Sequence, residues 1–162
     1  MTPSQPNIRR AEVVATAFSQ YRSCNRWAII VGISEYKLTQ WNLRFADRDA
    51  EAFAELLQTD SGGGFKSEYI CQLINQKATT QNLTKALRSF LQTPAREDLV
   101  GVYLACHGSP DINRPDNVYL LTHDTDPKDI AGTALPMREI NLALTENLLA
   151  EKVIILADTC HS

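Results

Sequence analysis

Five consecutive apolar residues near the end of the chain constrain its fold more than any other stretch. Residues 153–157 read Val-Ile-Ile-Leu-Ala, and the run stops at the polar cluster Asp158, Thr159, Cys160. An unbroken run of this kind predicts a strand covered on both faces, as in a parallel sheet. Ligands bind such sheets at the carboxyl ends of the strands. The sequence therefore predicts that a buried strand carries the thiol of Cys160 to the functional edge of an α/β sheet.

A second strand of the same kind predicts a partner for this thiol. Residues 99–106 are also largely apolar, and they are followed by His107 and Gly108. If the two strands are neighbours in one parallel sheet, Cys160 and His107 leave it side by side. Two further strands are predicted over residues 26–34 and 69–74. Gly32, near the end of the first, allows another backbone to approach closely.

Segments with helical spacing alternate with these strands. Apolar residues recur every three or four positions in residues 43–57, 79–91 and 136–148. Thr79 or Thr80 can cap the second helix, and Pro136 suits the first turn of the third. Between the strands we expect a loop at 109–117 and a short strand at 118–121. The alternation predicts an α/β fold, with a mostly parallel sheet and helices on both faces.

The same patterns divide the chain into two parts. Residues 1–25 are predicted to be an N-terminal extension, disordered over the first eight residues and partly helical over residues 8–21, where apolar residues form a stripe. Residues 26–162 are predicted to be one domain. Four cysteines far apart in a domain of this size do not predict disulfides.

The charge and hydropathy of the chain bear on its partners and location. The net charge is only −3, which gives no electrostatic signature for nucleic acid or an anionic membrane. No apolar stretch approaches the roughly 20 residues that cross a bilayer, and the N-terminus does not resemble a signal peptide. We therefore expect no nucleic-acid or membrane partner and a cytoplasmic location.

The pairing of His107 with Cys160 predicts acyl-transfer chemistry. The thiolate is the reactive form of cysteine, and a histidine that titrates near neutrality can take up its proton. The backbone N–H groups of Gly108 and Cys160 can stabilise an oxyanion. One alternative is a buried structural cysteine beside a satisfied histidine. A zinc site of Cys106, His107, Cys160 and His161 is another, but it lacks the closely spaced cysteine pairs of structural zinc sites.

Several of these motifs resemble one family. They are residues 103–109 (Tyr-Leu-Ala-Cys-His-Gly-Ser), 119–124 (Tyr-Leu-Leu-Thr-His-Asp) and 153–162, with residues 27–34 and 43–50 in support. Together they resemble the caspase-like cysteine peptidases, particularly metacaspases and the prokaryotic orthocaspases, over residues 26–162. The resemblance implies a caspase-like fold.

The resemblance also implies roles for four residues. His107 and Cys160 match the catalytic dyad, with Cys160 attacking the scissile carbonyl. Asp49 and Asp158 match the acids that line a substrate pocket for a basic side chain. Two carboxylates in a partly closed pocket favour Arg and Lys over Asp, so the resemblance implies a cysteine endopeptidase that cleaves after Arg or Lys. Alternatively, Asp49 is a helix acid favoured by the dipole and Asp158 a turn acid.

Two positions and one short stretch depart from the family pattern. Cys106 stands where the family usually has Gly, and Ala105 where many metacaspases have Ser. Residues 135–138 read Leu-Pro-Met-Arg where many metacaspases have a calcium-binding aspartate pair; Asp124 and Asp126 lie outside that motif. We therefore expect no resident cofactor or metal, and calcium activation lacks its usual ligands here.

The last departure concerns the end of the sequence. Members of the family continue past the Cys-His-Ser motif into a smaller, p10-like portion, so the resemblance implies that the sequence corresponds to the large, p20-like portion alone. We expect weak or no activity until a p10-like portion is supplied, for example as a separate chain. The main alternative is an inactive or partner-dependent half-domain that acts as an interaction module through an unfinished sheet edge. A different Cys-His acyl transferase or hydrolase on a similar sheet is a third possibility.

Overall fold

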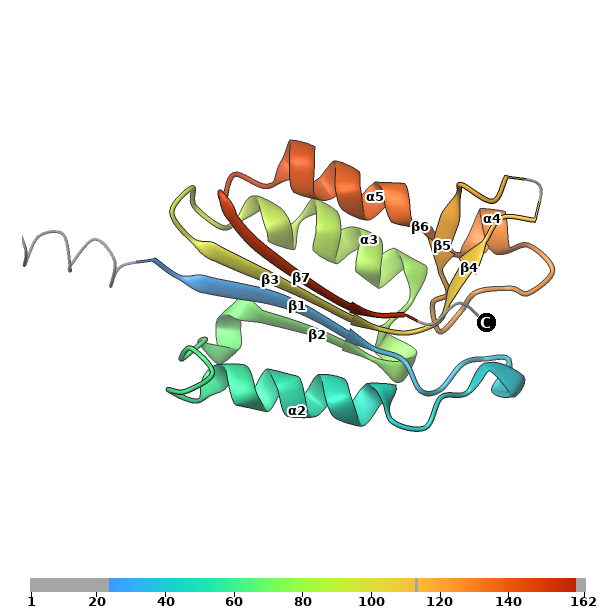
Figure 1. The fold of residues 1–162 in the computed structure, drawn as a ribbon, viewed down its shortest axis with the longest axis horizontal. Helices are drawn as coiled ribbons and strands as arrows, with labels where there is room; N and C mark the ends of the chain where they lie inside the picture. Colours follow the sequence, from blue (N-terminus) through green and yellow to red (C-terminus); the bar gives the residue numbers. More distant parts are fainter. Residues whose placement is uncertain (1–23, 113, 160–162) are drawn as a thin grey trace, which may run out of the picture.

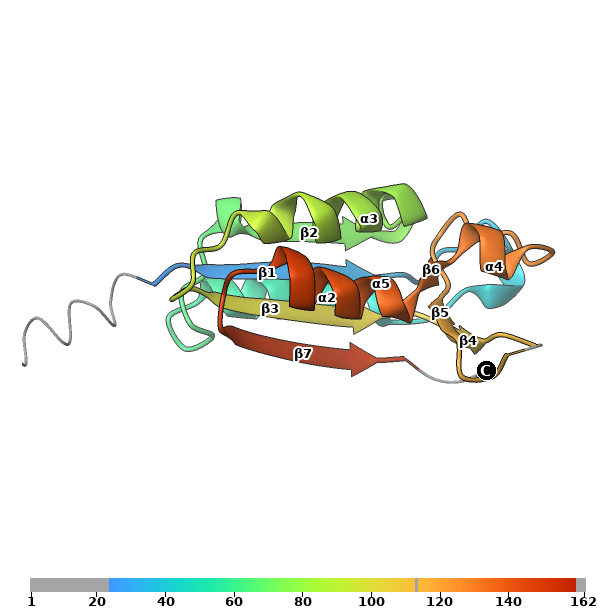
Figure 2. The same ribbon diagram turned by 90° about the horizontal axis from the view of Figure 1, so that it is seen from above.

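Four parallel strands form the main sheet of this computed structural model, which describes residues 24–112 and 114–159. The strands are β1 (Arg26–Gly32), β2 (Ile70–Ile74), β3 (Leu99–Ala105) and β7 (Lys152–Asp158), in the order β2-β1-β3-β7. They lie side by side when the molecule is viewed from above (Figure 2). The four predicted strands are thus confirmed, and the strands that lead to His107 and to Cys160 are neighbours.

Helices cover both faces of this sheet, as predicted. The helix α2 (Ala46–Gln58) lies on one face, and α3 (Thr80–Arg88) and α5 (Met137–Leu142) lie on the other (Figure 1). Thr79 caps α3, because its side chain accepts a hydrogen bond from the Asn82 N–H at 3.2 Å. A π-helical turn (Ala143–Asn147) extends α5. Short 3-10 turns occupy Thr39–Trp41, Ser67–Tyr69, Asn75–Lys77 and Phe90–Gln92.

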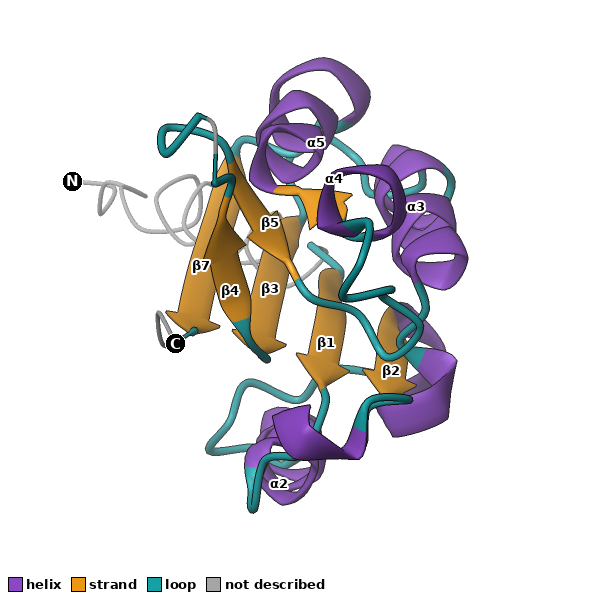
Figure 3. Cartoon of the chain, turned by 90° about the vertical axis from the view of Figure 1, so that its right-hand side faces the viewer, coloured by secondary structure: helices purple, strands orange, loops and turns teal. Residues whose placement is uncertain are grey.

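A small antiparallel sheet follows β3 along the chain. It contains β4 (Gly108–Pro110), β5 (Val118–Leu120) and β6 (Leu135–Pro136), with the short helix α4 (Ile130–Thr133) between the last two (Figure 3). The prediction of a loop over residues 109–117 is wrong at its start, because Gly108 and Pro110 pair with Leu120 and Val118. A strand of three residues that ends in Pro is too short to leave a periodic pattern.

Gly32 brings α2 into close contact with the sheet. A Cβ atom on Gly32 would lie 2.4 Å from the Ala50 Cβ and 2.6 Å from the Ala46 carbonyl oxygen. Ala50 and Ala54 of α2 are fully buried. The predicted close approach at Gly32 is therefore confirmed, and it fixes the helix that carries Asp49.

The burial predicted for β7 is wrong for the described chain. Its apolar side chains are well exposed, at 37% for Val153, 52% for Ile154, 49% for Ile155 and 45% for Leu156. Among the described residues β7 pairs only with β3, so its outer edge has no neighbouring strand. The apolar run correctly predicted a strand, but the burial of a strand also depends on neighbours that its own composition does not specify.

No helix within the described residues is long and apolar enough to cross a membrane.

Candidate active site

The carboxyl ends of β3 and β7 define the candidate site. Ala105 of β3 is paired with Asp158 of β7 in the parallel register, and Figure 3 looks toward the edge where these strands end. In the sequence, His107 stands two positions after Ala105, and Cys160 two positions after Asp158. Cys160 itself lies outside the described residues, so its geometry with His107 is not part of the structure.

A backbone carbonyl orients the imidazole of His107. The ring is half-buried, and its Nε2 atom lies 2.9 Å from the Trp41 carbonyl oxygen. A carbonyl oxygen only accepts hydrogen bonds, so Nε2 must carry the hydrogen in this contact. In the neutral ring Nδ1 is then the basic nitrogen. The contact thus selects the tautomer in which Nδ1 takes up a proton.

Tyr36 supports the same histidine from the backbone side. Its hydroxyl oxygen accepts a hydrogen bond from the His107 N–H at 3.0 Å, and the two rings lie 5.4 Å apart. Burial raises the pKa of Tyr36, and the nearby Cys106 raises it further. Tyr36 therefore stays neutral. Sequence reasoning missed Tyr36 and Trp41; the available signal was two aromatic residues in the segment that follows β1 at this edge.

A hydrogen-bond network anchors the segment that carries Tyr36 and Trp41. Asn75 Oδ1 accepts hydrogen bonds from the N–H groups of Ser34 (2.8 Å) and Glu35 (3.0 Å). Asp47 accepts from the Ser34 hydroxyl at 2.7 Å and from Asn75 Nδ2 at 3.1 Å. Burial alone would raise the pKa of Asp47, but these hydrogen bonds hold it below its usual value. The support of His107 is thus tied to α2 and to the end of β2.

Asp49 and Asp158 lie on the α2 side of the sheet, around Tyr103. Burial raises the pKa of Tyr103, and the charges of Asp49 and Asp158 raise it further. The Tyr103 ring stacks on Phe53 of α2, with centroids 4.8 Å apart. The structure thus brings the two predicted acids near one side chain, which sequence reasoning did not single out. Both acids are exposed, so the described residues do not form the partly closed pocket that was expected.

Cys106 belongs to the core and not to the site surface. Its side chain is 2% exposed, and burial raises the pKa of its thiol to about 12. It is therefore a neutral, unreactive thiol.

Gly108, whose N–H was predicted to stabilise an oxyanion, is buried at the start of β4. The described residues contain no group of three or more His, Cys, Asp or Glu side chains that could hold a metal ion.

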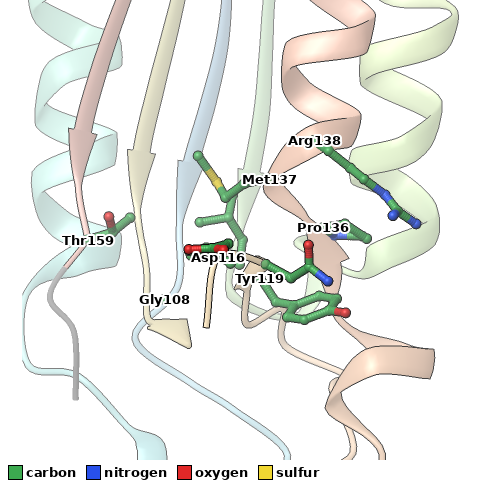
Figure 4. A pocket seen from close by; sticks show the side chains of 10 residues that line it. Gly108, Asp116, Tyr119, Pro136, Met137, Arg138 and Thr159 are labelled. Atoms are coloured by element: carbon green, nitrogen blue, oxygen red, sulfur yellow. The ribbon is translucent and has the colours of Figure 1, made fainter. Parts of the chain in front are cut away.

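A cavity of about 320 Å³ opens beside these strand ends, between β5 and the start of α5 (Figure 4). Met137 points from α5 toward the strand ends, whereas Arg138 extends away from them. Two of its lining residues, Gly108 and Thr159, are the sequence neighbours of His107 and Cys160. Its lining comprises Gly108, Asp116, Asn117, Val118, Tyr119, Leu120, Pro136, Met137, Arg138 and Thr159.

Comparison with known proteins gives a family and a fold. Residues 25–162 match the caspase domain family. No curated protein matches the chain. The chain is similar to the crystal structure of protein GSU0716 from Geobacter sulfurreducens, with 19% sequence identity and a TM-score of 0.66. The similarity covers 85% of this chain and 51% of that one, so the chain spans about half the length of this structural relative.

Proposed function

Because the chain belongs to the caspase domain family of peptidases, we propose that it is the large portion of a cysteine endopeptidase that cleaves after Arg or Lys. His107 and Cys160 form its catalytic dyad. The observation that carries the proposal is the contact between His107 Nε2 and the Trp41 carbonyl, because it leaves Nδ1 as the base at the end of the strand next to the one that leads to Cys160.

The proposed reaction proceeds through a thioester. His107 Nδ1 takes the proton from Cys160 Sγ, and the thiolate attacks the carbonyl carbon before the scissile bond. The N–H groups of Gly108 and Cys160 stabilise the oxyanion. The C–N bond breaks as the imidazolium gives its proton to the leaving amine. His107 then deprotonates a water molecule that attacks the thioester, which releases the carboxylic acid and restores the thiol.

Asp49 and Asp158 determine the proposed specificity. Their common effect on Tyr103 supports this role, since it means that both negative charges act on the same region of the α2 face. A guanidinium can bind carboxylates through two parallel hydrogen bonds, and an ammonium forms a compact ion pair. A substrate Asp would be repelled by both acids, so the site favours a basic residue before the scissile bond.

The exposed strand β7 supports a further part of the proposal. An apolar strand with an open edge recruits other strands, and a p10-like portion is the partner we propose for it. The chain alone is then weakly active or inactive. In this proposal, no nucleic acid, membrane or resident cofactor takes part in the reaction. Calcium activation lacks its usual aspartates. The proposed location is cytoplasmic.

The same strand favours one alternative function. A half-domain without activity can use the edge of β7, with exposed side chains from Val153 to Leu156, as an interaction module. The two functions differ in what they require of Cys160, because an interaction module does not need a reactive thiol.

Peptide cleavage and active-site labelling test the proposal together. We expect a peptidyl-Arg chloromethylketone to alkylate Cys160, and peptides with Arg or Lys before the scissile bond to be cleaved once the p10-like portion is added. The Cys160→Ala variant should keep the fold and lose all cleavage. Unchanged cleavage by this variant would refute the dyad. Binding of a partner through the edge of β7, together with a Cys160 that is not alkylated, would favour the interaction module.

A further inference from the structure

The cavity between β5 and α5 has a defined position relative to the proposed scissile bond. Gly108 directly follows His107 and Thr159 directly precedes Cys160 in the sequence, and both residues line the cavity. Successive residues of a strand point to opposite faces of a sheet. Asp158, the last residue of β7, acts on Tyr103 on the α2 side, whereas the next residue, Thr159, lines the cavity together with Met137 of α5.

In a peptide bound across the dyad, the parts before and after the scissile bond extend away from it in opposite directions. If the residue before that bond binds the acids on the α2 side, the residue after it leaves toward the opposite face. The cavity beside α5 is on that face. We infer that this cavity binds the side chain of the residue that follows the scissile bond, an inference that rests on the proposed function.

The lining of the cavity favours an apolar side chain. Val118, Pro136 and Met137 are half-buried, and Leu120 is 1% exposed. Tyr119 is also buried, and its hydroxyl is directed to Asp111 at 3.4 Å. A buried apolar wall stabilises an apolar group and penalises an unpaired charge.

The size and rim of the cavity further limit which side chains it can bind. A volume of about 320 Å³ is at the small end of the range for ligand pockets, roughly 300–1,000 Å³, and suits one large side chain. The two charged lining residues, Asp116 and Arg138, are exposed and carry opposite charges. The cavity therefore takes Leu, Met or Phe in preference to Gly or Asp.

Met137 provides a direct probe of this site. The chain has two methionines, Met1 and Met137, so a chain labelled with 13C at the methionine methyl groups gives one signal from the cavity and one reference. We would titrate the full chain with short peptide amides that have a free amino group and begin with Leu, Phe, Gly or Asp. Such peptides mimic the leaving product of the proposed cleavage.

We expect the Met137 signal to shift saturably with the Leu and Phe peptides, at concentrations at least tenfold lower than with the Gly and Asp peptides. The Met1 signal should not change. Equal responses to Leu and Gly peptides, or no response of Met137 to any of them, would overturn the inference. This measurement needs no turnover, so an inactive dyad contradicts the proposed function without affecting this result.

Two variants check that the response comes from the cavity. Val118→Glu places a charge in the lining and should weaken binding of the Leu peptide at least tenfold. Leu142→Glu places the same charge on α5 at an exposed residue (44%) outside the cavity lining, and should leave binding unchanged. Circular dichroism verifies that both variants fold. Equal weakening by both would indicate a general effect of the added charge and contradict the assignment. The wild-type titration tests the assignment even if Val118→Glu does not fold.

Discussion

The two sides of the candidate site are built very differently. On one side, His107 is held by the Trp41 carbonyl and the Tyr36 hydroxyl, and the segment that carries these groups is anchored by Asp47 and Asn75. On the other side, Asp49 and Asp158 are exposed, and the outer edge of β7 has no neighbouring strand within the part of the chain that the structure describes. The described chain thus fixes the orientation of the proposed base by itself, whereas the proposed enclosure of a basic side chain needs further structure.

The largest expected effect is on the side of the base. Replacement of His107 by Ala should lower kcat/KM for Arg and Lys peptides by about 10³-fold in the active assembly, because acid–base catalysis typically contributes about 10²–10⁴-fold. His123→Ala is the matched control. The Nδ1 atom of His123 also contacts a backbone carbonyl, that of Glu35, at 2.6 Å, so this variant reports the effect of removing an imidazole from the same supporting segment. Equal losses in both variants would show that His107 acts only through the fold.

The next largest effect on kcat/KM is expected on the side of the site that carries Asp49 and Asp158. Asp158→Ala should lower kcat/KM for Arg and Lys peptides by about 100-fold, since an enclosed cation without its partner is costly. Glu55→Ala, an exposed acid on α2, is the control and should have little effect. A loss of only a few fold would mean that the acidic side stays as open in the working enzyme as it is here. Cleavage after Asp at the same rate would refute the pocket.

A change in the packing of α2 should affect stability. Gly32→Ala adds a methyl group within 2.4 Å of the Ala50 Cβ, so we expect a loss of about 2 kcal/mol in the free energy of unfolding, typical of overpacking. Gly101→Ala on β3 is the control, because the nearest atom to its added Cβ is 3.8 Å away. Urea unfolding measures both. Similar losses would show that the cost comes from strand glycines in general and not from the contact with α2.

The smallest effect concerns acid stability on the side of the base. The pKa of Asp47 is lower in the folded chain than in the unfolded chain. Asp47 therefore makes its full contribution to stability above its pKa in the unfolded chain, about 4. This contribution is lost as the pH falls through its pKa in the folded chain.

Asp47→Asn should lower the free energy of unfolding by about 1 kcal/mol at pH 7, the usual value of one hydrogen bond. The difference from wild type should shrink below pH 4. Urea midpoints at pH 7, 4 and 2.5 measure it, with the exposed residue Asp60, changed to Asn, as the control. A difference that is constant with pH would show that the Asp47 charge does not anchor the segment.

Much of the fold could be predicted because it depends on local patterns. The apolar runs located β1, β3 and β7, and helical spacing located α2 and α3. Gly32 predicted a close contact because only Gly leaves the space that α2 fills. In the small sheet, the strand predicted over residues 118–121 is confirmed by β5, but β4 and β6 were missed, since strands of two or three residues depend on pairing partners and not on periodicity.

The site was predictable only in part, for a similar reason. The prediction that two strands are neighbours correctly placed His107 at the end of the strand beside the one that leads to Cys160. The Trp41 contact could not be predicted, because a backbone carbonyl has no residue signature. Tyr103 was missed because its role depends on two charges that meet from separate elements. The exposure of β7 could not be predicted from its apolar composition, although the alternative of a half-domain with an unfinished sheet edge did imply it.

The reactivity of Cys160 as a function of pH tests the central claim most directly. The full chain would be alkylated with iodoacetamide across a pH series, and each of the four cysteines followed by peptide mapping. We predict that Cys160 reacts fastest, with a midpoint below the ordinary thiol pKa of about 8.5, and that His107→Ala moves this midpoint up to the ordinary value. Buried Cys106 should be the slowest. A Cys160 midpoint near 8.5 in wild type, unchanged by His107→Ala, would contradict the account.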